Sequence, residues 1–285
     1  METGEKEKIR EAVRARYGEV ARSEIVAPGT SPAASCCTPS TPTAQTIPMA
    51  SCCPGGPDPS LENVSAAIGY TNEEIHSVPE GANMGLGCGN PVALASLKSG
   101  ETVVDLGCGG GFDCFLASKE VGETGEVIGV DMTPEMITKA RENVEKMGAS
   151  NVEFRLGEIE HLPVADNSAD IIMSNCVINL SPDKLSVYRD AFRVLKPGGR
   201  LAISDVVATA PLPNEIRKNL ALLTACIGGA ATIEDTEEML KEAGFQDIKI
   251  EPNEKSGEFI REWIPGKSVE DYVVSAYIEA IKPSM

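Results

Sequence analysis

Histidine is scarce in this chain, which has only His76 and His161 among its 285 residues. A mechanism that depends on a histidine general base therefore has few candidates. Basic residues are also in the minority, with 25 Lys and Arg against 43 Asp and Glu and a formal net charge of -18. Because an acidic surface repels phosphate backbones, this balance argues against nucleic acid as a partner.

Long apolar runs are missing as well. No stretch of about eighteen apolar residues occurs, so we expect no segment to span a bilayer. The first residues, METGEKEKIREAVRARYGEV, are charged and lack the apolar core of a secretory signal. We therefore expect a cytoplasmic protein without membrane association, with a monomer as the default state.

Cysteine, in contrast, is plentiful. The chain has nine cysteines, an odd number for a secreted disulfide framework, and it is too long to need such cross-links. In a reducing compartment we expect free thiols, metal ligands or redox partners. Four of them form two doublets, Cys36-Cys37 and Cys52-Cys53, and adjacent cysteines bridge to each other only with strain. We expect the doublets to bind a ligand or to bridge elsewhere.

The N-terminal segment 1–61 reads as a helix followed by a linker. Residues 5–22 place Ile9, Val13 and Tyr17 at helical spacing. This charged helix is expected to be solvated, although its part RARYGEVA could close over an active site. The segment that follows is rich in Pro, Ser and Thr and too poor in apolar residues to fold alone, so we expect a flexible N-terminal extension.

A pattern of strands alternating with helices starts near residue 90. The apolar runs ETVVDL, GEVIGVDM, NVEFRLGEI, SADIIMSNC and RLAISDVV alternate with helical stretches such as PEMITKARENVEKMG. Such alternation predicts an α/β fold with a doubly wound, mostly parallel sheet. DIKIEP and YVVSAYIEAIKP, separated by the helical FIREWIPG, bring the sheet to seven strands, and the last strand can be antiparallel. We divide the rest of the chain into a core at 62–205, a substrate-covering insertion at 206–232 and a C-terminal segment at 233–285.

A glycine-rich loop follows the first of these strands. In DLGCGGGFD, Asp105 precedes the glycines, and a second acid, Asp131, ends the next strand about twenty residues later. In such sheets, ligands bind at the carboxyl ends of the strands, where glycines allow close approach of the backbone. A nicotinamide cofactor or a simple glycine turn would also fit the loop alone. An acid before the glycines favours a cofactor with a cationic amino group and no phosphate.

The pair VVDLGCGGG and VIGVDM resembles the motifs of class I S-adenosylmethionine methyltransferases, which have a Rossmann-like fold. The resemblance implies that Asp105 to Gly111 surround the amino-acid half of S-adenosylmethionine and that Asp131 and Met132 hold its ribose. It also implies that GEIEHLP lines the adenine. The cofactor-binding set is then Asp105, Gly107, Cys108, Gly109, Gly111, Asp131, Met132, Gly157, Glu158, Ile159 and Asn175.

Three further cysteines lie in segments that the fold can bring together. Cys176 ends the fourth strand, Cys226 lies in the insertion, and Cys88 lies before the first strand, each within two residues of Gly or Asn, which suit exposed turns. A buried apolar role is the ordinary reading of a single free cysteine. Three convergent thiolates would instead form a soft site, without the close cysteine pairs of structural zinc. A trigonal, thiophilic ion such as As(III) fits, and its lone pair stays free as a nucleophile.

The motifs SNCVINLSPDK and CIGGA resemble those of arsenite methyltransferases, and the resemblance extends over residues 62–282. It implies that Cys88, Cys176 and Cys226 hold As(III) during methyl transfer in arsenic detoxification, with arsenite or its thiol conjugates as substrate. It also implies a thiol reductant of the glutathione or thioredoxin type, and the doublets stay without an assigned role. The alternatives are a quinone- or lipid-type C- or O-methyltransferase and a thiol-rich metalloid-binding protein without turnover.

Overall fold

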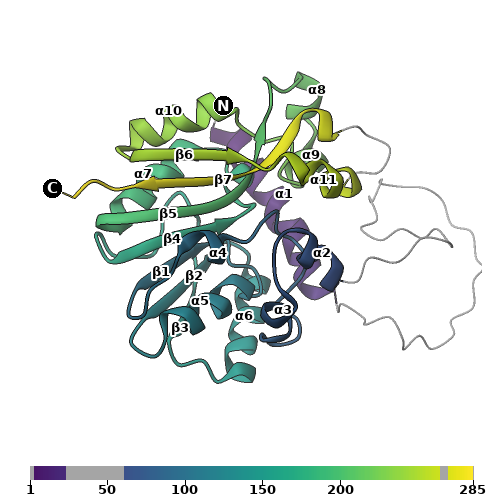
Figure 1. Ribbon diagram of the computed structural model, residues 1–285. Coiled ribbons are helices and arrows are strands. Elements are labelled where there is room, and N and C mark those ends of the chain that lie inside the picture. Colours follow the sequence, from purple (N-terminus) through teal and green to yellow (C-terminus); the bar gives the residue numbers. More distant parts are fainter. Residues whose placement is uncertain (1–2, 24–60, 264–268, 285) are drawn as a thin grey trace, which may run out of the picture.

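The computed structural model describes residues 3–23, 61–263 and 269–284, in which seven strands form one sheet (Figure 1). The strand order is β3-β2-β1-β4-β5-β7-β6, and β7 is antiparallel to both of its neighbours while the other pairs are parallel. This confirms the predicted doubly wound, mostly parallel sheet. The strands are β1 (Thr102–Leu106), β2 (Glu126–Asp131), β3 (Val152–Leu156), β4 (Ala169–Asn175), β5 (Leu195–Ala208), β6 (Gln246–Pro252) and β7 (Val273–Ile281).

Helices cover both faces of the sheet and its carboxyl edge (Figure 1). None of the helices in the described ranges has the length and apolar character needed to cross a membrane. They are α1 (Thr3–Arg22), α2 (Leu61–Ala67), α3 (Asn72–His76), α4 (Pro91–Ala95), α5 (Phe112–Val121), α6 (Pro134–Met147), α7 (Lys184–Val194), α8 (Asn214–Arg217), α9 (Leu220–Leu223), α10 (Ile233–Ala243) and α11 (Gly257–Trp263), with short 3-10 turns η1 (Ile178–Leu180), η2 (Glu254–Ser256) and η3 (Val269–Asp271).

Local sequence explains most of these boundaries. Helix α6 has proline in its first turn and ends at Gly148, whose φ of 69° suits a residue without a side chain. Helix α10 was not predicted, although it has equally clear end signals. Its N-cap, Thr232, accepts a hydrogen bond from the Asp235 amide at 3.0 Å, and Gly244 closes the other end in the left-handed conformation.

Side chains that alternate along the strands belong to two apolar cores, one on each face of the sheet. Val104 and Leu106 of β1 pack toward α7 and α10, whereas Val103 packs toward α4, α5 and α6 on the other face. A third apolar cluster lies at the carboxyl ends of β4 and β5 and includes Ile9 and Val13 of α1. This third cluster also contains the cysteines considered below, and it therefore positions the candidate site.

Candidate active site

The glycine loop after β1 depends on a backbone conformation that favours glycine. Gly107, Gly109 and Gly111 have φ values of 69°, 51° and 92°. A Cβ atom on Gly107 would also lie 2.5 Å from the side chain of Val177, which leaves no room for any other residue. Gly111 is the N-cap of α5, so the loop leads directly into that helix. The loop thus turns the backbone tightly over the carboxyl end of β1.

An open cavity lies beyond this loop, and the space between its walls, open solvent included, is about 1080 Å³. Its walls come from the carboxyl ends of β1, β2 and β4 and from α1, which supplies Arg10, Val13 and Tyr17. Of the segment RARYGEVA only Tyr17 lines the cavity, so α1 packs one face on the site, whereas a solvated helix was the main expectation. The lining includes nine of the residues predicted for cofactor or arsenic binding, namely Asp105, Gly107, Cys108, Gly109, Asp131, Met132, Ile159, Asn175 and Cys176.

The segment that was predicted to line the adenine differs in detail from the sequence-based expectation. Ile159 and Glu160 line the cavity, whereas Gly157 and Glu158 are not among its lining residues. Glu158 instead forms an ion pair with Arg14 of α1 at 2.6 Å. Glu160 is 4% exposed, and its Oε1 accepts a hydrogen bond from the Ser181 hydroxyl at 2.7 Å. Arg10 of α1 pairs with both carboxylates, at 3.4 Å for Glu158 and 3.2 Å for Glu160, and the folded structure places Glu160 in the cavity wall.

Asp131 fixes the glycine loop to the end of β2. Its Oδ2 accepts a hydrogen bond from the Gly109 amide at 3.1 Å, and its Oδ1 accepts one from the Thr133 amide at 2.8 Å. Burial raises the pKa of Asp131, while the two amide hydrogen bonds lower it. Asp131 thus shapes the loop as well as offering carboxylate oxygens to a bound ligand.

Two more carboxylates are buried in the same region. Asp105 accepts a hydrogen bond from the Cys114 thiol at 3.2 Å, and its pKa is raised first by burial and then by the negative charge of Asp113. Asp113 accepts hydrogen bonds from the Tyr70 hydroxyl and from Asn175, and burial raises its pKa to about 6. Asp113 and Tyr70 were missed from the sequence, although Asp113 lies only two residues after the last glycine of the loop.

This group of acids selects the kind of ligand that the cavity fits. Within the described chain, no Lys or Arg forms an ion pair with Asp105, Asp113 or Asp131. Buried carboxylates without a cation favour a positively charged ligand and disfavour the pyrophosphate of a dinucleotide. S-adenosylmethionine has an ammonium group, a sulfonium and no phosphate, so the residues present fit it.

The three predicted cysteine ligands are buried rather than in exposed turns. Cys88, Cys176 and Cys226 are 1%, 4% and 4% exposed. The expectation of exposure was wrong because the third apolar cluster, with α1 and the insertion, covers the turns in which they lie. A dry, apolar surrounding protects thiols from oxidation and strengthens any polar interaction formed among them.

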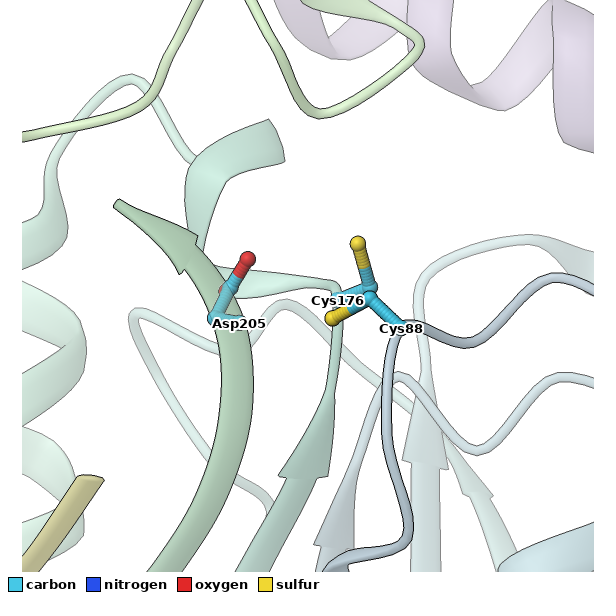
Figure 2. Close-up of side chains that lie close together, drawn as sticks. All are labelled: Cys88, Cys176 and Asp205. Carbon is cyan, nitrogen blue, oxygen red and sulfur yellow. The ribbon is translucent and has the colours of Figure 1, made fainter. Parts of the chain in front are cut away.

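The thiols converge at the ends of β4 and β5. The sulfurs of Cys88 and Cys176 and a carboxylate oxygen of Asp205 all lie within 4.8 Å of one another (Figure 2). Cys226 joins them from the insertion, since its thiol donates a hydrogen bond to the carbonyl of Cys176 at 2.7 Å. Hydrogen bonding to the thiol of Cys226, then to that of Cys88, and burial raise the pKa of Cys176.

Two of these cysteines have a strained backbone. Cys176 and Cys226 have φ values of 58° and 63°, in the left-handed region that residues with a side chain rarely adopt. The other non-glycine residues with positive φ in the described ranges are Ser96, Asn167 and Asp247. Strain held by buried surroundings is concentrated at functional sites. The strained backbone at Cys176 and Cys226 is thus consistent with a site whose function requires side chains where glycine would fit more easily.

Asp205 is the neighbour of the thiols that the sequence did not reveal. Its carboxylate accepts hydrogen bonds from the amides of Ile178 and Val206 and from the side chain of Asn179, at 2.7–2.9 Å. Burial raises its pKa to about 6. Its position at the carboxyl end of β5 was the available signal. The doublets Cys36-Cys37 and Cys52-Cys53 lie outside the described residues.

Comparison with known proteins agrees with this geometry. Residues 97–244 match the model of a methyltransferase domain family. The chain is 57% identical over 220 residues to an arsenite methyltransferase of Halobacterium salinarum, covering 77% of this chain and 56% of that protein. It is 45% identical over 152 residues to the human arsenite methyltransferase, covering 50% and 40%. The chain thus spans about half the length of these curated relatives.

A solved structure agrees with both fold and sequence. An arsenic(III) S-adenosylmethionine methyltransferase from Chlamydomonas reinhardtii superposes with a TM-score of 0.57 at 34% identity, covering 78% of this chain and 73% of that one. The glycine loop, the acids beside it and the buried thiols thus occur in a chain that matches this family in sequence and in fold. The chain belongs to the arsenite methyltransferase family of S-adenosylmethionine-dependent methyltransferases.

Proposed function

We propose that this chain transfers methyl groups from S-adenosylmethionine to trivalent arsenic bound by Cys88, Cys176 and Cys226. The observation that carries the proposal is the convergence of these buried thiols at one wall of the cofactor cavity, where Cys176 itself lines the cavity. Cys226 lies in the segment 206–232, which we propose as the arsenic-binding insertion between the core and the C-terminal segment. A metalloid held there would be next to the methyl donor.

Binding of arsenous acid does not require free thiolates. Each thiol can replace one hydroxide of the acid, so that an As–S bond forms, an As–O bond breaks and the thiol proton leaves with the hydroxide as water. The raised pKa of Cys176 therefore does not prevent binding. For Cys226, binding requires that its thiol give up the hydrogen bond to the Cys176 carbonyl. The buried surroundings exclude the water that would reverse the exchange.

When bound, S-adenosylmethionine supplies a sulfonium methyl group to the arsenic lone pair, and arsenic passes formally from the trivalent to the pentavalent level. The chain contributes mainly position, and orientation of two reactants can contribute about 7–11 kcal/mol relative to a bimolecular encounter. Asp105, Asp113 and Asp131 place negative charge around the cationic donor. We further propose a thiol reductant of the glutathione or thioredoxin type, a cytoplasmic location and a monomer.

Product analysis tests the proposed function directly. Incubation of the protein with arsenite, S-adenosylmethionine and glutathione should give methylated arsenic and S-adenosylhomocysteine. Mass spectrometry should find one S-adenosylhomocysteine for each methyl group transferred to arsenic. Arsenite bound by the protein without any methylated product would instead indicate a sequestering protein. Methylation of an added quinone, with arsenite unchanged, would indicate the C- or O-methyltransferase alternative.

The affinity for S-adenosylhomocysteine should rise as the pH increases from 5 to 7. The pKa of Asp113 in the free protein is about 6, so at pH 5 the carboxyl is largely protonated. A bound ammonium group favours the ionised form, and binding below this pKa must therefore release a proton, which weakens binding by up to about tenfold for each pH unit and group. Calorimetric titrations at pH 5, 6 and 7 measure the trend. Asp113→Asn should reduce the slope, and an affinity that stays flat in the unmodified protein would contradict the assignment.

A further inference from the structure

One side chain, Asn175, contacts both halves of the candidate site. It is the last residue of β4 and directly precedes Cys176. Its Oδ1 accepts a hydrogen bond from the amide of Cys88 at 2.9 Å, and its Nδ2 lies 3.2 Å from a carboxylate oxygen of Asp113. The predicted role of Asn175 was cofactor binding alone. The contact with Cys88 adds a second role that the sequence did not indicate.

The Nδ2 group of Asn175 faces more acceptors than it can serve. Besides Asp113, it lies 2.9 Å from the hydroxyl oxygen of Tyr70 and 2.9 Å from the carbonyl of Gly89. An amide nitrogen carries two hydrogens, so three acceptors compete for two donors. Tyr70 cannot relieve this competition, since its own hydroxyl hydrogen is donated to Asp113. In the free protein one of the three acceptors therefore receives no full hydrogen bond from Asn175.

The competition reaches the loop that holds Cys88. This loop packs tightly on Asn175, because a Cβ atom added to Gly87 would lie 2.6 Å from Nδ2. Asn175 makes two of the hydrogen bonds that hold the loop. Its Oδ1 accepts one from the Cys88 amide, and its Nδ2 donates one to the Gly89 carbonyl. Strengthening the bond to Gly89 would therefore fix Cys88 more firmly beside Cys176, with which it shares the site shown in Figure 2.

We propose that Asn175 is a positioning residue that couples cofactor binding to arsenite binding. The proposal rests on the proposed function, since it assumes that Cys88 is an arsenic ligand. An ammonium group bound beside the acids offers Asp113 new donors. This releases an Asn175 hydrogen for Gly89 and orders the Cys88 loop. The two ligands then bind with positive cooperativity, and each must tighten the other by the same factor.

Calorimetry with arsenite and S-adenosylhomocysteine tests the coupling without turnover. In the unmodified protein, saturating S-adenosylhomocysteine should tighten arsenite binding by at least about fivefold, the lower end of typical coupling between sites. In Asn175→Ala the ratio of the two arsenite dissociation constants should fall to within about twofold of one, because the shared side chain is gone. A ratio near one in the unmodified protein, or an unchanged ratio in the variant, would overturn the coupling.

Ser275→Ala is the matched control. The Ser275 hydroxyl donates to the Cys88 carbonyl at 2.8 Å, so it holds the same loop, but from β7. Its loss should weaken arsenite binding equally with and without S-adenosylhomocysteine, leaving the ratio unchanged. A ratio that collapses in this variant as well would show that any loosening of the loop removes the effect, against a specific role of Asn175.

Hydrogen exchange gives a readout that does not depend on a variant. In the unmodified protein, S-adenosylhomocysteine alone should slow amide exchange in residues 88–90, which do not line the cavity, and unchanged exchange there would overturn the proposal. Failure of the proposed function looks different. If the unmodified protein binds S-adenosylhomocysteine but no arsenite, both proposals fall, whereas arsenite binding with a ratio of one removes the coupling alone.

Discussion

Replacing Cys176 by serine should lower the rate of arsenite methylation by at least about a hundredfold, because a hard hydroxyl is a poor ligand for thiophilic arsenic. Serine has nearly the same shape, so the strained backbone at φ 58° and the buried contacts should persist. The affinity for S-adenosylhomocysteine should change by less than about twofold, since loss of one thiol leaves the buried acids that face a cation intact. Rates from product mass spectrometry and affinities from calorimetry measure the two effects separately.

The pattern across the thiols makes this test specific. Cys226→Ser should show the same loss, although Cys226 lies 50 residues away in the chain, because its thiol contacts Cys176. Thr138→Ala, on the exposed surface of α6, should leave the rate unchanged, since its hydroxyl bonds only to the Pro134 carbonyl of the same helix. Full activity in both cysteine variants would contradict the three-thiol site.

Asp131→Ala should weaken binding of S-adenosylhomocysteine by on the order of a hundredfold, equivalent to about 2.7 kcal/mol. The carboxylate is buried and accepts hydrogen bonds from the amides of Gly109 and Thr133. Its removal leaves both amides unpaired beside the cavity, at about 1–3 kcal/mol for each buried group, and loosens the glycine loop. Calorimetric titration of the purified variant measures the loss.

Asp170→Ala is the control for a general effect of removing an aspartate. Asp170 also accepts a backbone hydrogen bond, from the Thr102 amide at 2.9 Å, but it lies at the amino end of β4, beside the amino end of β1 and away from the cavity. Its loss should lower thermal stability slightly without changing the affinity for S-adenosylhomocysteine. Equal weakening of binding in both aspartate variants would show that stability, and not the contact of Asp131, accounts for the effect.

The fold could be predicted far into its details because local patterns carry it. Neighbouring residues in the sequence are enough to indicate the conformation of three segments: the β-branched run before Asp105, the glycine loop, and the helix that ends at Gly148. The antiparallel final strand followed from the order of elements. Helix α10 was missed although Thr232 and Gly244 marked its ends, because its acidic sequence hid the apolar stripe that includes Leu240.

The chain's own sequence determined which chemistry is available: two acids around a glycine loop, few histidines and three scattered cysteines. These follow from residue types and short spacings, which the sequence states directly. Only the tertiary structure decided that the thiols are buried, that Asp205 is close to two of them, and that Asn175 joins Asp113 to the Cys88 loop. The two hydrogen bonds of Asn175, with Asp113 and with the Cys88 amide, join residues 62 and 87 positions apart. Burial and competition for donors depend on which segments the folded sheet brings together, and no local pattern encodes them.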